Sequence, residues 1–176
     1  RDGGGGSIRG ISVGPGGINT VSMVASGENQ NLALRVDGMV RAWDNSGLQP
    51  VPNGLTNVIG IAAGKNHYLA LRADSTVVAW GSNNLGQGEV PAGLSNVVSI
   101  AAGGDASLAL RADGSLVQWG NLPNPPVDLG PVASIGVGSA HALAVLQIEA
   151  ADQPPLFLNQ SDAMGAVGQW IYRRLA

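Results

Sequence analysis

The sequence lacks cysteine altogether and contains few basic and few aromatic side chains. Without cysteine, the 176 residues can form neither disulfides nor thiolate zinc sites. Lys65 is the only lysine, and the formal net charge of −3 argues against nucleic acid as a partner, because nucleic-acid binding asks for a basic face. No apolar run reaches the ~18 residues that a membrane-spanning helix needs. The sequence therefore predicts a protein without a membrane span.

Motifs of catalysis are missing as well. There is no G-x-S-x-G, no phosphate-binding loop and no H-E-x-x-H. The two histidines, His67 and His141, each stand three residues after a glycine, with no cysteine and few carboxylates nearby. A metal ion needs convergent ligands, so we interpret both as structural histidines. We expect no enzymatic activity, no cofactor and no metal site.

The sequence contains 27 glycines, and some of them separate the apolar runs of a segment that is repeated several times along the chain. In Val97–Gly120, VVSIAAGGDASLALRADGSLVQWG, three short apolar runs bounded by turn residues predict three strands. Asp113-Gly114 between two of these runs predicts a two-residue hairpin turn of type I′. The glycine of this passage recurs at Gly27, Gly64, Gly103 and Gly138, and its tryptophan at Trp43, Trp80 and Trp119.

Self-similarity at such a period predicts a solenoid or a propeller, and the absence of a helical period favours sheets. Strands that are apolar on both faces suit sheets stacked face to face. We predict an all-β fold, a β-propeller segment of about four blades with three to four short antiparallel strands per blade. The repeats are placed at 21–57, 58–96, 97–130 and, incompletely, 131–146. Residues 1–20 are interpreted as a truncated preceding blade or a Gly-rich linker, and 147–176 as a C-terminal extension or the start of a following segment, either helix or strand.

The repeated residues carry a resemblance. The run from Trp80 to Gln87, WGSNNLGQ, followed by Val90-Pro91, resembles the regulator of chromosome condensation repeat, and most closely its bacterial version. It is also similar to propeller-type beta-lactamase inhibitory proteins. The resemblance covers roughly residues 21–146 and implies a seven-bladed β-propeller. About four blades cannot close such a ring, so the chain is a piece of a longer protein, two chains close a ring together through their open edges, or the arc stays open. Of these we favour a piece of a longer protein.

Recognition on a rigid repeat scaffold usually resides in its loops, and here the loops after the glycine and after the tryptophan differ between repeats. They are small and polar, with Tyr68 as the aromatic exception. The residues we predict to contact a partner are Glu28, Asn29, Gln30, Lys65, Asn66, Tyr68, Asp105, Asp44, Asn83 and Asn84.

The sequence thus predicts a non-enzymatic, protein-binding scaffold. By resemblance we place it in a bacterial secreted or surface protein, at the cell surface or outside the cell, with a protein partner of unknown identity. One alternative from the same resemblance is an inhibitor of a secreted enzyme such as a beta-lactamase. Guanine-nucleotide exchange on a small GTPase is a less favoured alternative, because every repeat is too compact to hold an inserted wedge.

Overall fold

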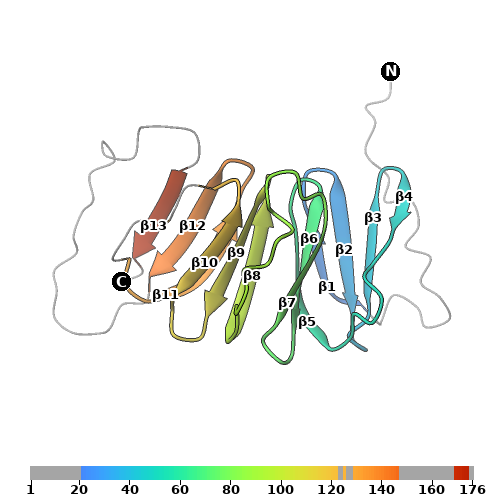
Figure 1. The fold of residues 1–176 in the computed structure, drawn as a ribbon, viewed down its shortest axis with the longest axis horizontal. Coiled ribbons are helices and arrows are strands. Elements are labelled where there is room, and N and C mark those ends of the chain that lie inside the picture. The colour runs from blue at the N-terminus through green and yellow to red at the C-terminus, as the bar shows by residue number, and fades with distance from the viewer. Residues whose placement is uncertain (1–20, 123–124, 126–128, 147–168, 175–176) are drawn as a thin grey trace, which may run out of the picture.

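The computed structural model describes residues 21–122, 125, 129–146 and 169–174. The described residues form thirteen strands and no helix, arranged in four separate sheets (Figure 1). The predictions for residues 1–20 lie outside the described residues, as do those for 147–168.

Each repeat forms one sheet, which we call a blade. Blade 1 contains β1 (Val21–Ser26), β2 (Gln30–Arg35), β3 (Val40–Asp44) and β4 (Gly47–Gln49). Blade 2 contains β5 (Val58–Ala63), β6 (His67–Arg72) and β7 (Val77–Gly81). Blade 3 contains β8 (Val97–Gly103), β9 (Ala106–Arg111) and β10 (Leu116–Gly120). Blade 4 contains β11 (Val132–Val137), β12 (His141–Leu146) and β13 (Gln169–Arg174).

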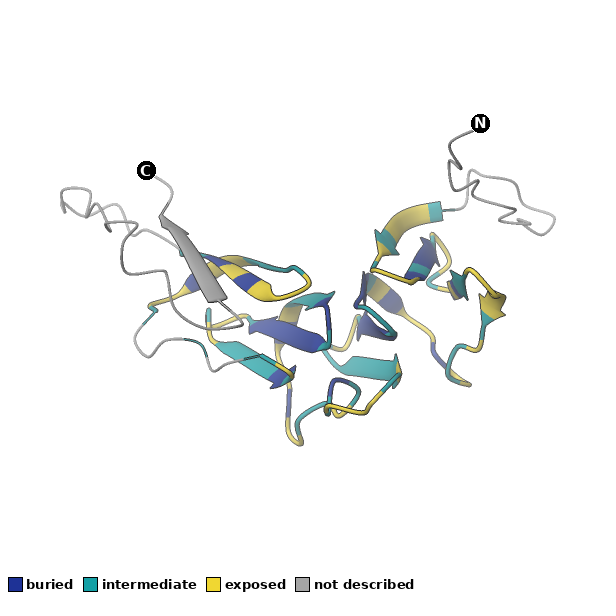
Figure 2. Cartoon of the chain, turned by 90° about the horizontal axis from the view of Figure 1, so that it is seen from above, coloured by how far each residue is buried: buried dark blue, intermediate teal, exposed yellow. Residues whose placement is uncertain are grey.

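The blades stand side by side around an open arc, with blade 1 at one end of the arc and blade 4 at the other (Figure 2). The first strands β1, β5, β8 and β11 neighbour one another in succession, so they are the inner strands of the arc. The repeated glycine is explained by this crowding. A Cβ on Gly27 would overlap the carbonyl of Gly64, and a Cβ on Gly103 would overlap that of Gly138. The architecture confirms the predicted all-β propeller segment of four blades.

Every inner strand carries the same irregularity near its start. The pairing with the next strand shifts register between Val21 and Met23, and at the matching place in β5, β8 and β11. Such a β-bulge adds one unpaired residue and re-aims its neighbours. In β8 the added residue Val98 is 54% exposed, whereas the preceding Val97 is 2% exposed. The bulge therefore directs the valine that begins the inner strand inward and the next residue outward.

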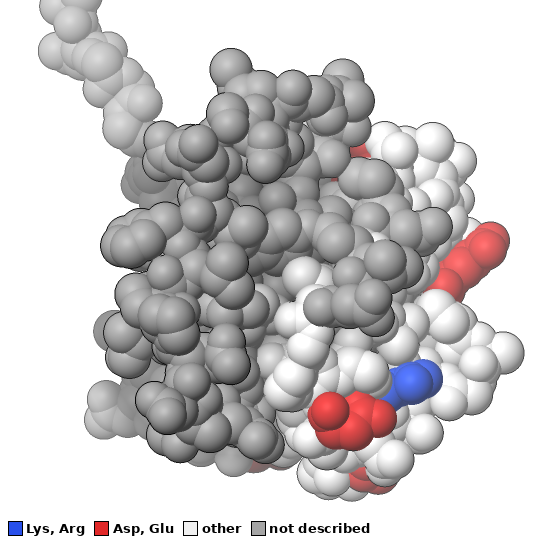
Figure 3. Space-filling view, turned by 90° about the vertical axis from the view of Figure 1, so that its left-hand side faces the viewer, with Lys and Arg blue, Asp and Glu red and all other residues white. Residues whose placement is uncertain are grey.

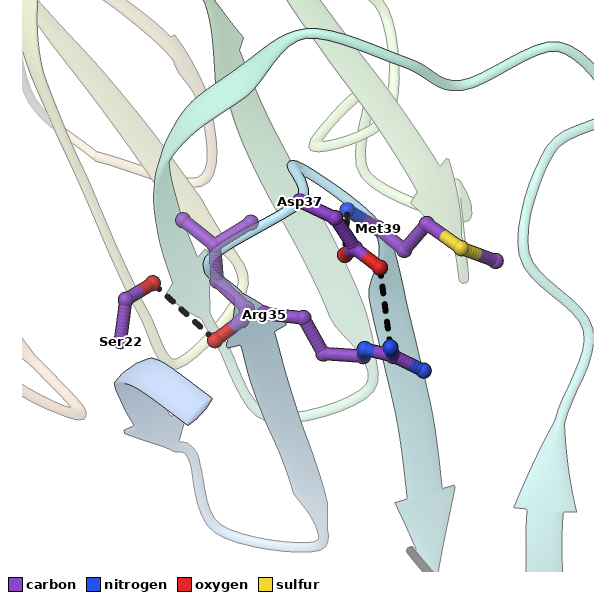
Figure 4. Close-up of polar contacts among 5 residues, drawn as sticks. Ser22, Arg35, Asp37 and Met39 are labelled. Carbon is purple, nitrogen blue, oxygen red and sulfur yellow. Dashed lines mark hydrogen bonds and ion pairs between the residues drawn. The ribbon is translucent and has the colours of Figure 1, made fainter. Parts of the chain in front are cut away.

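The type I′ turn predicted at Asp113-Gly114 is wrong, because the Gly114 N–H donates to the Arg111 carbonyl (3.0 Å) and the Arg111 N–H to the Ser115 carbonyl (2.9 Å), and Asp113 has no positive φ. The equivalent turn of blade 1 has the same pattern. The Gly38 N–H donates to the Arg35 carbonyl (2.9 Å) and the Arg35 N–H to the Met39 carbonyl (2.9 Å), which makes a three-residue loop. Gly38 has a φ of 77°, but Asp37 has no positive φ, as type I′ would require. This is a turn closed by a glycine bulge. Asp37 accepts from the Met39 N–H (3.1 Å) and pairs with the Arg35 guanidinium (2.9 Å), as Figure 4 shows.

The sequence left open whether residues 147–176 form helix or strand, and the structure answers this for Gln169–Arg174. β13 is a strand, and it completes blade 4 by pairing with β12 in parallel. Trp170 pairs with Ala142, which is the second residue of the middle strand β12. Trp43, Trp80 and Trp119 likewise pair with the second residue of the middle strand of their own blades. A tryptophan thus holds the same register position in all four blades, although the fourth strand runs in the opposite direction.

A candidate protein-binding rim

Strand pairing brings the two variable loop sets to one end of the sheets. Gln30 pairs with Asp44, and His67 pairs with Gly81, so the loop after the glycine lies beside the loop after the tryptophan. We call this end the glycine rim, which consists of residues 27–29, 44–46, 64–66, 82–89, 104–105, 121–122 and 138–140. The opposite end, with residues 36–38, 73–75 and 112–114, is called the turn rim.

Four of the predicted residues meet across the seam between blades 1 and 2. The Asn29 Nδ2 donates to the Asn66 Oδ1 at 3.2 Å. The Lys65 Nζ lies 3.9 Å from the Glu28 carboxylate, and both side chains are more than two-fifths exposed. A pair this exposed contributes ~1 kcal/mol or less to stability, so these groups remain accessible to a partner.

Gln30 and Tyr68 lie in the interior of the same seam. They are 9% and 3% exposed, and the Tyr68 hydroxyl donates to the Gln30 Oε1. The Tyr68 ring stacks on Trp80 with the ring centroids 5.2 Å apart. Burial, and secondarily the negative charge of Asp44, raises the pKa of Tyr68 to about 12. The one aromatic among the predicted residues therefore holds two blades together, and its burial does not support a direct contact with a partner.

Sequence reasoning missed the residue that organises the next seam. Gln87 is 1% exposed, and its Oε1 accepts from the Leu85 N–H at 2.8 Å. Its Nε2 donates to the Asp105 Oδ1 at 3.2 Å, which links blade 2 to blade 3. Its carbonyl accepts from the Ser107 hydroxyl and from the Trp119 indole N–H, each at 2.9 Å. The signal was present, since Gln87 belongs to the WGSNNLGQ run, but this run occurs only once in the chain.

His67 extends this buried network. It is fully buried, and its Nε2 lies 3.0 Å from the Ser107 hydroxyl. Burial lowers the pKa of His67 below 6.5, although Asp105 and the Ala106 backbone act in the opposite direction. A Cβ on Gly64 would overlap the imidazole, so the glycine makes room for the ring. The prediction of a structural histidine holds for His67, whereas His141 is exposed.

The remaining predicted residues lie on the surface of the glycine rim or at its margin. Asn83 and Asn84 are exposed, and the Asn83 Nδ2 donates to the Glu89 Oε1 at 3.1 Å. Asp44 and Asp105 are half-buried. Among the described residues, the glycine rim carries Glu28, Asp44, Glu89 and Asp105 against Lys65 as its one basic side chain, not counting histidine. At the turn rim, by contrast, each aspartate stands two residues after an arginine that ends the adjoining strand, at Arg35 and Asp37, Arg72 and Asp74, and Arg111 and Asp113.

The glycine rim also surrounds a small hollow of about 180 Å³, where the inner strands end. Glycine, alanine and serine predominate in its lining, which includes Gly27, Gly64 and Gly103. Ligand pockets usually measure ~300 Å³ or more and contain convergent polar side chains. Within the described residues, no three His, Cys, Asp or Glu side chains gather closely enough to hold a metal ion. The described part of the chain likewise contains no helix long and apolar enough to cross a membrane.

Comparison with known proteins identifies the class of fold and then its repeat. The chain resembles solved β-propellers: it is 30% identical, at a TM-score of 0.60, to Prp20p from Saccharomyces cerevisiae, over 74% of this chain and 44% of that one. The same yeast protein bound to Kap60 gives 30% identity and a TM-score of 0.59, over 74% of this chain and 42% of that one. Human WBSCR16, at 21% identity and a TM-score of 0.58, covers 72% of this chain and 44% of that one and supports the fold. The chain thus spans less than half the length of each of these relatives.

The repeat itself is recognised in blade 2. Residues 58–87 match the Regulator of chromosome condensation (RCC1) repeat. The resemblance to this repeat is therefore confirmed, while the likeness to its bacterial version and to beta-lactamase inhibitory proteins stays a prediction. No curated protein sequence matches the chain.

Proposed function

We propose that the chain is a non-enzymatic scaffold that binds a protein through its glycine rim, and that the bound surface is basic. The observation that carries the proposal is the charge of this rim, where four carboxylates accompany a single lysine among the described residues. Charge complementarity steers association and selects partners, so an acidic rim favours a basic surface.

The names of the yeast relative's structures agree with such a role. They describe Prp20 bound to Kap60, and the binding properties of Prp20p to Gsp1p and histones. RCC1-type propellers therefore include a protein that binds other proteins. For this chain, histones serve as a probe of the proposal, because they are strongly basic proteins.

A matched pair of variants tests the role of the rim. The triple variant E28Q/D44N/E89Q removes three charges from the glycine rim, and D37N/D74N/D113N removes three from the turn rim. Each brings the formal net charge from −3 to zero. Binding of core histones is measured by isothermal calorimetry at two salt concentrations. We expect the glycine-rim variant to weaken binding by about tenfold, which corresponds to ~1.4 kcal/mol, and the turn-rim variant to retain it.

Equal weakening by both triple variants would show that histones respond to net charge alone, and it would overturn the proposal. Retained binding in the glycine-rim variant would overturn it as well. The asparagines on the turn rim still accept the hydrogen bonds that Asp37, Asp74 and Asp113 accept from the backbone, so the control is expected to fold normally.

Two other functions remain as alternatives. Inhibition of a secreted enzyme would call for a projecting aromatic anchor, and the predicted one, Tyr68, is buried. Nucleotide exchange on a GTPase would need an inserted wedge, whereas the described loops at 27–29, 64–66 and 104–105 are short. The bacterial, secreted setting stays a prediction that the resemblance supports.

A further inference from the structure

The three arginines beside the turn rim are paired differently. In blade 1 the Arg35 guanidinium pairs with the Asp37 carboxylate at 2.9 Å (Figure 4). In blades 2 and 3 the equivalent Arg72 and Arg111 side chains make no hydrogen bond and no ion pair within the described residues, although an aspartate again stands two residues later. Two guanidinium groups at this rim are therefore without a carboxylate partner.

The residue two positions after each aspartate explains the difference. In blade 2 this residue is Thr76, whose backbone N–H (3.0 Å) and hydroxyl (2.6 Å) both donate to the Oδ1 of Asp74. These hydrogen bonds lower the pKa of Asp74 more than the charge of Arg72 does. Ser115 donates in the same way to the aspartate of blade 3, at 2.9 Å and 2.6 Å. In blade 1 the residue is Met39, which has no hydroxyl and donates only its backbone N–H.

Arg72 lines a hollow of about 430 Å³ at the turn rim, together with the linker that enters blade 2. Thr56 and Asn57 bring a hydroxyl and an amide to the lining, and neither side chain makes a hydrogen bond within the described residues. The Ala73 N–H donates to the Asn57 carbonyl at 2.9 Å, which holds the linker against the turn. The volume is that of a ligand pocket, for which ~300–1,000 Å³ is usual. Described blades flank the hollow on both sides, so it does not arise from the ends of the chain.

Blade 3 repeats the same set of groups. Its linker carries Ser95 and Asn96 at the positions of the hydroxyl and the amide. Asn57 and Asn96 both have a φ of 56°. The Ala112 N–H donates to the Asn96 carbonyl at 2.9 Å, as its equivalent does in blade 2. A hydroxyl, an amide and an unpaired guanidinium thus occur together twice, on the same backbone geometry.

We propose that the hollow beside Arg72 binds a carboxylate group, supplied by a small organic acid or by an acidic side chain of a peptide, and that Arg111 offers a second site of the same kind. The fork of a guanidinium matches a carboxylate, and the two groups form strong charge-assisted hydrogen bonds. The Thr56 hydroxyl and the Asn57 amide are the neutral donors beside it.

Two observations favour a carboxylate over other anions. The Arg35–Asp37 pair of blade 1 is this contact made within the chain. In addition, Asp74 is part of the lining, and it repels a phosphate, with its higher negative charge, more strongly than a carboxylate. The ligand therefore takes the place at Arg72 that the aspartate occupies in blade 1.

The site acts through local groups and not through a broad basic surface. The formal net charge is −3, and Figure 3 shows few charged groups on the described part of the surface at the blade 4 side. Binding therefore depends on contact with the guanidinium and its neighbours rather than on long-range attraction. The proposal goes beyond the proposed function and does not depend on it, because the turn rim lies at the opposite end of the sheets from the glycine rim.

Titration of the ¹⁵N-labelled 176-residue chain with succinate at constant ionic strength, followed by amide chemical shifts, is the test. We expect saturable shifts at 54–57 and 72–74, and at 93–96 and 111–113, with a Kd of about 1–10 mM. Arg72→Gln should abolish the shifts of the first two segments and leave those of the last two. Arg41→Gln is the matched control, because it removes an exposed arginine from the middle of β3 and should leave both sites intact.

Thr76→Met tests why the guanidinium is unpaired, because it places the residue of blade 1 in blade 2. Without the hydroxyl, the Asp74 carboxylate should pair with Arg72. Blade 2 should then bind succinate about tenfold more weakly or worse, while blade 3 is unchanged. The substitution changes no charge, so a general salt effect would be the same in the variant and the wild type.

A peptide amide with a single glutamate is the second carboxylate probe. Tighter binding than that of succinate assigns the site to peptide side chains, and weaker binding assigns it to small organic acids. Shifts that do not saturate, that persist in a folded R72Q chain, or that T76M leaves unchanged would each overturn the proposal. Tighter binding of inorganic phosphate than of succinate would overturn the assignment to carboxylates.

Discussion

Gln87 allows the seam between blades 2 and 3 to be tested by a single isosteric substitution. In Gln87→Glu the Oε1 still accepts from the Leu85 N–H, and the backbone carbonyl still accepts from Ser107 and Trp119. Only the Nε2 is lost, and an oxygen takes its place 3.2 Å from the Asp105 carboxylate. The perturbation is therefore confined to one donor that becomes one charge.

The magnitude has two contributions. Loss of the hydrogen bond between the blades costs about 1 kcal/mol. Two carboxylates 3.2 Å apart repel by between about 1 kcal/mol in water and about 5 kcal/mol at an effective dielectric constant of 20. Since Asp105 is half-buried, we take a value in the lower part of that range. Because the side chain at position 87 is 1% exposed, burial of the new charge adds to these two contributions, and the variant should lose at least about 3 kcal/mol of its free energy of unfolding at pH 7.

Urea unfolding followed by tryptophan fluorescence measures this loss, at one fixed protein concentration so that association does not change the apparent stability. The double variant Q87E/D105N is the control, because the asparagine amide can donate to the new carboxylate. It should recover the part of the loss that comes from the repulsion and from the missing hydrogen bond. A single variant within about 0.5 kcal/mol of the wild type would refute the reasoning, and so would a double variant no more stable than the single one.

Three further predictions concern individual residues. Burial lowers the pKa of His67 below 6.5, so its contribution to stability is fully present above pH 6.5 and is lost as the pH falls. The free energy of unfolding of His67→Gln should accordingly depend less on pH between pH 7.5 and 5. Gly64→Ala should lower the free energy of unfolding by about 2 kcal/mol or more, because the new Cβ overlaps the His67 ring. In the same urea assay, Gly64→Ala/His67→Ala should be more stable than Gly64→Ala/His67→Gln. Ser75 adopts a φ of 63°, and the equivalent turns have Gly38 and Gly114 at this position. Ser75→Gly should therefore raise the free energy of unfolding by up to about 1 kcal/mol, and the thermal midpoint with it. A lowered midpoint would contradict this prediction.

The repeat made the fold predictable from the sequence, because four aligned passages place the same strands and the same glycine in every copy. The spacing of Gly27, Gly64 and Gly103 identifies them as equivalent from the sequence alone, whereas the lack of room for a Cβ at each of them is seen only in the structure. Gln87 was harder to assign, because its partners Asp105, Ser107 and Trp119 lie 18 to 32 residues further along the chain, in the next blade. A contact between blades leaves no local pattern in the sequence.

The candidate rim was predictable as an end of the scaffold but not side chain by side chain. Variation between repeats singled out Glu28 and Asn66, and equally Gln30 and Tyr68, which are buried between two blades. Variation alone does not distinguish a surface position from a position between blades. Gln30 and Tyr68 differ from their equivalents because they bond to each other across the seam. The parallel pairing of β13 was also beyond the sequence, since Gln169–Arg174 lies outside the repeat.

The central claim is that partners bind at the glycine rim. Hydrogen–deuterium exchange of the chain with and without bound core histones tests it directly, because it reports protection along the whole backbone. Slower exchange is expected in 27–29, 64–66 and 104–105, with exchange in 36–38, 73–75 and 112–114 unchanged. Protection confined to the turn rim, with the glycine-rim loops unaffected, would contradict the claim.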